Sequence, residues 1–307
     1  MRPLLVPLLT CLVASCSEEP RAHIMPMWIQ GGHPAIEVRL AGSAEPLRFV
    51  VDSAAAGSLV DERVARRIAI EVEGAAAVSG AGANGIATGM RNTRETEWRL
   101  GDMKLRFAPM QTDLSGLSKG DDPAIDGIIG NDITRRWRTR WDFANGQLQL
   151  FPAASVSDLD ECQANALPTR RPGLQDFGFI KMTLGATKVE AIALIDTGAA
   201  QTILNGEAAR RLGLRMDGSD ARLRVRKEGT QGLGGAPAPT WLYDLSTIST
   251  FGWQRDDLEV RISALSIFTL LGLGDLPAVI LGADAMADSQ IEISPNAERI
   301  CLRRITG

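Results

Sequence analysis

The sequence of 307 residues is poor in histidine and in aromatic residues. It contains two histidines, His23 and His33, both near the N-terminus, and aromatic residues make up 5% of the chain. This scarcity argues against a histidine-rich metal site and against a Ser-His-Asp triad, since both depend on imidazole side chains. His33 lies in a Gly-Gly-His-Pro stretch just before an expected strand, and a loop histidine without function is the favoured interpretation.

Cysteine pairs and an excess of positive charge are missing as well. The four cysteines, at positions 11, 16, 162 and 301, form no Cys-x-x-Cys pair, which excludes zinc ribbons and thioredoxin-like redox chemistry. The net charge is −4, from 33 basic and 37 acidic residues, so nothing points to a nucleic acid partner. The reactive groups that remain are carboxylates, hydroxyls and amides, and we expect neither a metal nor a cofactor.

Glycine is abundant, with 31 residues, and there are 15 prolines. Together with the few aromatic residues, this composition favours many short strands and turns over a helical bundle, so we expect a mainly β fold. The length allows one large domain or two of about 150 residues.

The first sixteen residues form a targeting segment. MRPLLVPLLTCLVASC has one positive charge and then an apolar run that is too short to span a membrane, which needs about 20 residues. Its end resembles a bacterial lipobox, which implies cleavage after residue 15, a lipid on Cys16 and a tether over residues 16–23. The resemblance places the protein at the periplasmic side of a membrane, with the outer membrane favoured. The alternative is an ordinary secretion signal in which Cys16 has no role.

Two cysteines remain after the loss of Cys11 with the signal. Cys162 and Cys301 would lie in an oxidising compartment, where they could form a disulfide or stay as two buried free thiols. Cys162 has no basic neighbour in the sequence that would make its thiol reactive.

An internal repeat organises the rest of the chain. A shift of 144 residues places 52–70 on 196–214 with six identities, and a shift of 152 places Ile128–Asp132 on Ile280–Asp284. Two blocks in the same order indicate a duplication. We therefore expect two lobes, over residues 24–152 and 172–307, joined by a polar linker over 153–171.

The two halves share a pattern of short elements. Each has an apolar strand that ends at an aspartate and a tight turn, followed by a short helix with Asp61 or Asn205 as its N-cap. In the first half, Arg136, Arg138 and Arg140 alternate with Trp137, Thr139 and Trp141, which predicts a half-buried strand with a basic face turned to solvent or to anionic lipid.

The aspartates carry the chemistry. Ile195-Asp196-Thr197-Gly198-Ala199, with the later block Ile280-Leu281-Gly282, matches the signature of aspartic proteases. The chain resembles the bacterial retropepsin-like aspartyl proteases, with two lobes fused as in pepsin. The resemblance implies a bilobal fold, a polypeptide substrate, no cofactor, and a chain that acts as a monomer.

Asp52 and Asp196 are the catalytic residues that the resemblance implies. Two adjacent carboxylates share one proton, so the ionised one can activate a water while the other polarises the scissile carbonyl. We expect Ser53 and Thr197 to hydrogen-bond across the pseudo-twofold axis and Gly198 to let its backbone N–H approach a carboxylate.

The first lobe departs from the family pattern, because it has Ala54 where glycine is expected. The extra methyl could shift a backbone donor or require a strained φ. Taken alone, Asp52 could be an ordinary turn residue that accepts local hydrogen bonds. The repeat favours the catalytic dyad instead. The rival to a protease is a catalytically silent lipoprotein that binds peptides in a protease-like cleft.

Two glycine-rich stretches occupy equivalent places in the two halves. The first contains Gly80, Gly82 and Gly85, and the second contains Gly232 and Gly234. The first matches the Gly-x-Gly-x-x-Gly pattern, but no helix follows it, which argues against a dinucleotide site. We expect flaps that bind the substrate, with plain hairpin tips as the alternative. The only tyrosine is Tyr243, so the tyrosine of a pepsin-type flap is missing.

Overall fold

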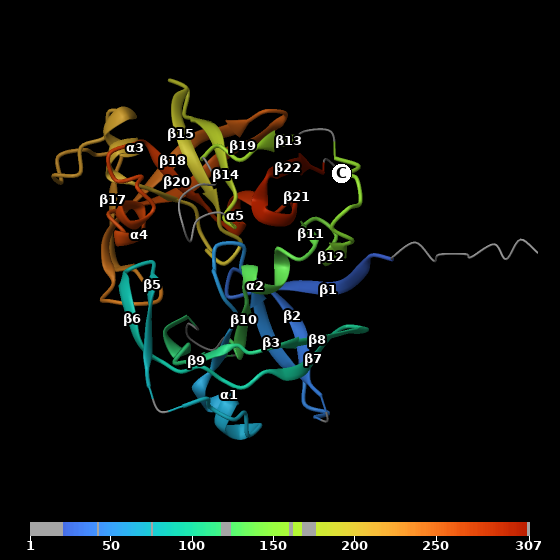
Figure 1. Cartoon of the computed structure of the whole chain (residues 1–307). Helices are drawn as coiled ribbons and strands as arrows, with labels where there is room; N and C mark the ends of the chain where they lie inside the picture. Colours follow the sequence, from blue (N-terminus) through green and yellow to red (C-terminus); the bar gives the residue numbers. More distant parts are fainter. Residues whose placement is uncertain are drawn as a thin grey trace, which may run out of the picture.

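The computed structural model describes residues 21–41, 43–74, 76–117, 124–159, 162–167 and 176–305 (Figure 1). The structure is mainly β: of the described residues, 48% lie in strands and 12% in helices. Figure 1 shows the first half, in blue to green, below the second half, in yellow to red. The predicted signal peptide, with Cys16, lies outside the described residues.

The described residues of the first half form twelve strands and two short α-helices. The strands are β1 (His23–Gln30), β2 (His33–Leu40), β3 (Leu47–Val51), β4 (Leu59–Asp61), β5 (Val78–Gly82), β6 (Gly85–Met90), β7 (Thr96–Leu100), β8 (Met103–Phe107), β9 (Met110–Thr112), β10 (Gly127–Ile129), β11 (Arg138–Asp142) and β12 (Gln147–Phe151). The helices are α1 (Glu62–Arg67) and α2 (Asn131–Thr134), with a 3-10 turn at Ser115–Leu117.

Over residues 176–305, the part of the second half that the structure describes, there are nine strands, three short α-helices and a 3-10 turn at Pro295–Ala297. The strands are β14 (Phe179–Leu184), β15 (Val189–Ile195), β16 (Ile203–Leu204), β17 (Arg224–Thr230), β18 (Ala238–Thr250), β19 (Trp253–Ser263), β20 (Ala278–Leu281), β21 (Ser289–Ile293) and β22 (Arg299–Arg304). The helices are α3 (Gly206–Arg211), α4 (Ser266–Leu270) and α5 (Ala283–Met286). Strands β14, β15, β20, β16, β19 and β18 close into a six-stranded barrel through the pairing of β14 with β18.

The same strand arrangement surrounds each aspartate. Strand β10 pairs parallel with β3, so that Ile129 faces Val51, and antiparallel with β4. Strand β20 pairs parallel with β15, so that Leu281 faces Ile195, and antiparallel with β16. Each aspartate strand thus lies beside the strand of the second repeated block. The duplication seen in the sequence is a duplication of structure.

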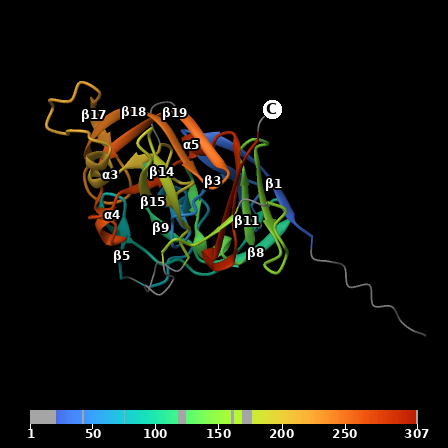
Figure 2. The ribbon, with the colours of Figure 1, turned by 90° about the horizontal axis from the view of Figure 1, so that it is seen from above.

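One sheet joins the two halves. It runs in the order β13-β22-β21-β11-β12-β1, and β13 (Cys162–Ala164) comes from the predicted linker. Cys162 lies opposite Cys301 in this sheet, and the two form a disulfide. In Figures 1 and 2 this sheet and β17 lie at opposite sides of the molecule.

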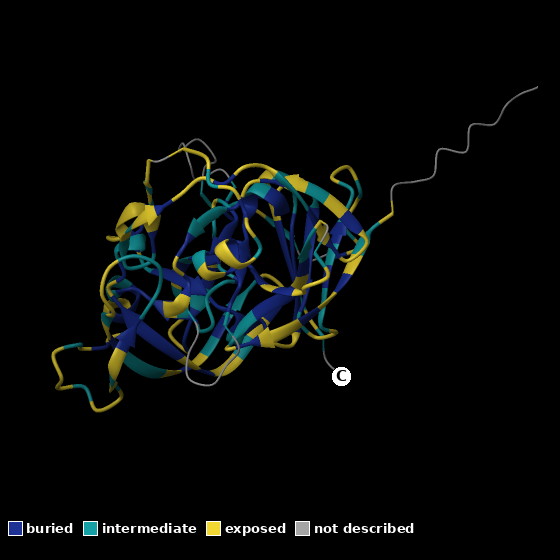
Figure 3. Cartoon of the chain, turned by 90° about the horizontal axis from the view of Figure 1, so that it is seen from below, coloured by how far each residue is buried: buried dark blue, intermediate teal, exposed yellow. Residues whose placement is uncertain are grey.

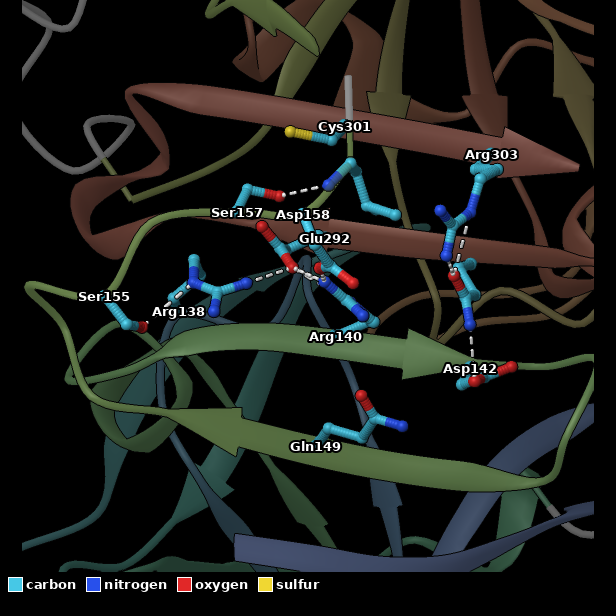
Figure 4. Close-up of polar contacts among 12 residues, drawn as sticks. Arg138, Arg140, Asp142, Gln149, Ser155, Ser157, Asp158, Glu292, Cys301 and Arg303 are labelled. Carbon is cyan, nitrogen blue, oxygen red and sulfur yellow. Dashed lines mark hydrogen bonds and ion pairs between the residues drawn. The ribbon is translucent and has the colours of Figure 1, made fainter. Parts of the chain in front are cut away.

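Of the three arginines of the predicted basic face, Arg136 is exposed and precedes β11, whereas Arg138 and Arg140 are buried in it. The prediction that the face is turned to solvent or lipid is therefore wrong for Arg138 and Arg140. Arg138 and Arg140 are 6% and 4% exposed. Both form ion pairs with Glu292, which lies opposite Arg140 on β21 of the second half, and Arg140 also pairs with Asp158 (Figure 4). Phe151 packs against both guanidinium groups. The arginines face inward because their counter-charges come from elsewhere in the chain.

Buried residues follow the strands through the interior, whereas most of the exposed ones lie on outer loops and strand edges (Figure 3). The largest apolar cluster extends through both halves and includes Trp98, Trp141 and Trp253. Among the residues that the structure describes, no helix is both long and apolar enough to cross a membrane.

Candidate active site

Each predicted catalytic aspartate directly follows a buried strand. The backbone N–H of Asp52, after β3, donates to the carbonyl oxygen of Ile129 at 2.9 Å. The N–H of Asp196, after β15, donates to the carbonyl oxygen of Leu281 at 3.1 Å. In both lobes the neighbouring strand therefore fixes the first residue of the aspartate loop.

The hydroxyls that follow the aspartates bind the two loops to each other. The N–H of Ser53 donates to Oγ1 of Thr197 at 3.0 Å, and the N–H of Thr197 donates to Oγ of Ser53 at 3.0 Å. Each hydroxyl also donates to a carbonyl of the opposite lobe, Ser53 to Ile195 at 2.8 Å and Thr197 to Val51 at 2.7 Å. Both side chains are buried, at 1% and 0% exposure, so the loops form one rigid unit.

The two carboxyl groups contact each other, and both have raised pKa values. Burial raises the pKa of Asp52, and the N–H of Ala54, which donates to its Oδ1 at 2.7 Å, acts in the opposite direction. Burial, and after it the charge of Asp52, raise the pKa of Asp196 well above its ordinary value. The N–H of Ala199, which donates to Oδ1 of Asp196 at 2.9 Å, opposes this rise. A pair of this kind holds one proton over a wide pH range.

Gly198 lies directly against the carboxyl group of Asp52. A Cβ atom on Gly198 would be 2.2 Å from Cγ of Asp52, so the position requires glycine. Its backbone N–H stabilises the ionised forms of both Asp52 and Asp196. One glycine of the second lobe thus serves both carboxylates.

Ala54 fits the matching position of the first lobe without strain. It is not among the described residues with positive φ, and its N–H reaches the Asp52 carboxylate as noted above. Its side chain packs against an apolar cluster of the second lobe that includes Leu194. The extra methyl therefore neither removes the backbone donor nor forces an unusual φ.

In each lobe a further carboxylate accepts a hydrogen bond from a hydroxyl that follows the predicted catalytic aspartate by six residues. Ser58 Oγ donates to Asp132 at 2.7 Å, and Thr202 Oγ1 donates to Asp284 at 2.7 Å. Burial raises the pKa of both carboxyl groups, and the hydroxyl bonds oppose that rise. These aspartates belong to the second repeated block. The repeat itself was the signal that could have assigned them this supporting role.

The glycine-rich stretches form two hairpin connections that meet. Gly80 and Gly82 lie in β5 and Gly85 begins β6, so the first stretch is the tip of a β-hairpin. Gly232 and Gly234 lie in the loop between β17 and β18 of the second lobe. A Cβ atom on Gly234 would be 2.7 Å from the carbonyl oxygen of Gly85, so the two tips touch.

Two contacts near the site have no clear signal in the sequence. Nδ1 of His33 lies 2.7 Å from the carbonyl oxygen of Gly198, so it donates to the aspartate loop of the other lobe. Asn84, at the first hairpin tip, donates from Nδ2 to carbonyl oxygens of Thr230 and Ala236. The partners are more than a hundred residues away in sequence, and local patterns give no indication of such contacts.

The remaining predicted site residues lie apart from the aspartates. Cys162 and Cys301 are in the sheet that joins the halves. The described part of the chain contains no group of three or more His, Cys, Asp or Glu side chains that could hold a metal ion.

Comparison with known proteins agrees with this geometry. The family model described as aspartyl protease matches residues 36–133 and 181–285, about two thirds of the chain. The first match contains Asp52 and its neighbouring strand β10, and the second contains Asp196 and β20. No curated protein matches the chain. With the family model matched once in each half, the chain belongs to the aspartyl protease family.

Proposed function

We propose that the protein is an aspartic endopeptidase that hydrolyses peptide bonds with a water activated between Asp52 and Asp196. The observation that carries this proposal is the contact of two buried carboxyl groups, one from each lobe, on loops held together by Ser53 and Thr197. A dyad of this kind needs no histidine, metal or cofactor for acid–base catalysis.

The unequal surroundings of the two carboxyl groups suggest their roles. The pKa of Asp196 is raised both by burial and by the charge of Asp52, so we assign the shared proton to Asp196. Ionised Asp52, stabilised by the N–H of Ala54, would take a proton from the water as it attacks the carbonyl carbon. Protonated Asp196 would polarise the carbonyl oxygen. The proton taken up by Asp52 would then pass to the leaving amine.

The substrate in this proposal is a polypeptide bound in an extended form beneath the two hairpin tips. The protein would act as a monomer, because one chain supplies both aspartates. We propose that it is secreted across the inner membrane and held at the periplasmic face of a membrane, the outer membrane being favoured, by a lipid on Cys16. The described residues begin at Arg21, within the predicted tether over residues 16–23, and strand β1 begins at His23.

A silent peptide-binding protein is the second candidate, and the sequence feature behind it is Ala54 in place of the family's glycine. A digest of a peptide library at several pH values, with and without pepstatin, tests the two. The endopeptidase predicts pepstatin-sensitive cleavage by the wild type and a change of less than about twofold in Ala54→Gly, since Ala54 keeps its donor and an ordinary φ. An inert wild type together with a cleaving Ala54→Gly variant would establish the silent binder.

A further inference from the structure

Two apolar clusters lie beside the aspartate loops. The first-lobe cluster consists of the buried residues Val50, Leu59, Met90, Leu114, Ile125 and Ile128. Three of these have counterparts in the second-lobe cluster, which contains Leu194, Ile203 and Ile280 at the equivalent repeat positions. The first-lobe cluster also contacts Ala55, three residues after Asp52. The second-lobe cluster contacts Ala199, three residues after Asp196, so each cluster provides apolar packing beside an aspartate loop.

A side chain of the second lobe packs against the first-lobe cluster. Leu233, from the loop between β17 and β18, is half-buried and packs against it. The carbonyl oxygen of Leu233 accepts a hydrogen bond from the N–H of Asn84 at 3.2 Å. A Cβ atom on Gly82 would lie 2.0 Å from that same oxygen. Leu233 thus contacts the hairpin tip through its backbone and the cluster through its side chain, as a bound peptide would.

The side chain of Asn84 forms hydrogen bonds with the loop that contains Leu233. Its Nδ2 donates to the carbonyl oxygen of Thr230 at 2.9 Å and to that of Ala236 at 3.1 Å, one on each side of Leu233. The preceding residue, Ala83, accepts bonds at 3.3 Å from the N–H of Ile267 and from the hydroxyl of Ser266. The first-lobe hairpin is therefore fastened to the second lobe at several points.

We propose that Leu233 stands in for a substrate side chain in the first-lobe cluster and is the specificity-determining residue of that subsite. The inference rests on the proposed function. A peptide must draw Leu233 out of the cluster before it can reach the dyad, and it regains the lost contacts only with an aliphatic side chain of about the size of leucine. A peptide whose side chain at the first-lobe cluster is small leaves the cluster unfilled, and one whose side chain there is charged must bury that charge. Both kinds of peptide therefore displace Leu233 less readily than a peptide with an aliphatic side chain does.

Hydrogen exchange tests the placement of Leu233 independently of any cleavage. We expect Leu233→Ala to speed amide exchange about tenfold in residues 80–88 and 230–236 together, because the two segments hold each other closed. Asn84→Ala, which removes two hydrogen bonds, should speed amide exchange in both segments at least about fivefold. The matched control is Leu270→Ala, a leucine of the same lobe that is 54% exposed. Exchange no faster than in Leu270→Ala would overturn the proposal.

Cleavage of the peptide library tests the specificity. Leu233→Ala should raise kcat/KM about tenfold for peptides that place an aliphatic residue next to the cleaved bond, and should extend cleavage to larger aromatic residues there. Unchanged kcat/KM and an unchanged preference in an active enzyme would also overturn the proposal. If no variant cleaves while exchange is accelerated as expected, Leu233 is the internal occupant of the cluster and it is the proposed protease function that fails.

Discussion

Thr197→Val removes one hydroxyl from the bonds between the two aspartate loops while keeping the shape of the side chain. In the wild type this hydroxyl accepts from the N–H of Ser53 and donates to the carbonyl oxygen of Val51. The carbonyl of Val51 keeps a second donor, Nε1 of Trp141 at 3.2 Å. Most of the lost free energy of unfolding therefore comes from the N–H of Ser53, which stays buried without a hydrogen-bond partner in the variant.

An unpaired buried donor costs about 1–3 kcal/mol, and the lost bond from the hydroxyl adds about 1 kcal/mol. We expect Thr197→Val to lower the free energy of unfolding by about 2–4 kcal/mol. The looser loops should also lower kcat by about 10- to 100-fold, because small displacements of catalytic groups are costly. Urea denaturation and steady-state kinetics on a peptide from the library digest measure the two effects.

Thr139→Val is the matched control. Thr139 is equally buried, at 1% exposure, and its hydroxyl donates at 2.9 Å to the carbonyl oxygen of Thr134, away from the aspartates. Thr139→Val should lower the free energy of unfolding by about 1 kcal/mol and leave kcat unchanged. If Thr197→Val were no more harmful than Thr139→Val in both assays, the bonds across the axis would not hold the dyad as argued.

Three further predictions concern the glycine, the shared proton and the lipid. Gly198→Ala should displace the Asp52 carboxyl group and lower kcat by at least about 100-fold, whereas Gly116→Ala, where a Cβ meets open space, should have no effect; equal activities would contradict the close approach. Because the folded-state pKa of Asp196 is raised, its stabilising contribution is present at low pH and is lost as pH rises through that pKa. Asp196→Asn should therefore gain stability relative to the wild type as pH rises above about 4, the ordinary pKa of an aspartate, in urea denaturation, and a difference that stays constant with pH would refute this assignment. Cys16→Ser should release the protein from the membrane fraction, and its retention there would argue against a lipid anchor.

Local patterns in the sequence predict much of the framework. The strands before Asp52 and Asp196, and the helices capped by Asp61 and Asn205, depend on short-range rules of burial and capping, and the structure has them where expected. The repeat adds the long-range information that one such unit faces another. Without the repeat, Asp52 has no feature that distinguishes it from a turn residue.

Contacts between distant segments are what the sequence does not reveal. The alternation of arginines in β11 predicts one solvated face, and only the neighbouring strand β21, with Glu292, turns that face into an interior ion cluster. The polar linker likewise contains β13, because a free edge of β22 was available to pair with it. Asn84 favours a hairpin turn whether or not it binds a second lobe, so its contact with Thr230 leaves no trace in local sequence.

The most direct test of the central claim is the cleavage rate of Asp196→Asn on one peptide that the wild type cleaves. Asparagine keeps the shape of the side chain but removes the shared proton, so kcat should fall by at least about 100-fold while peptide binding is largely kept. Asp244→Asn, at an exposed ion pair with Arg224, is the matched control and should cleave normally. Cleavage that survives Asp196→Asn undiminished would mean that the catalyst lies elsewhere in the protein.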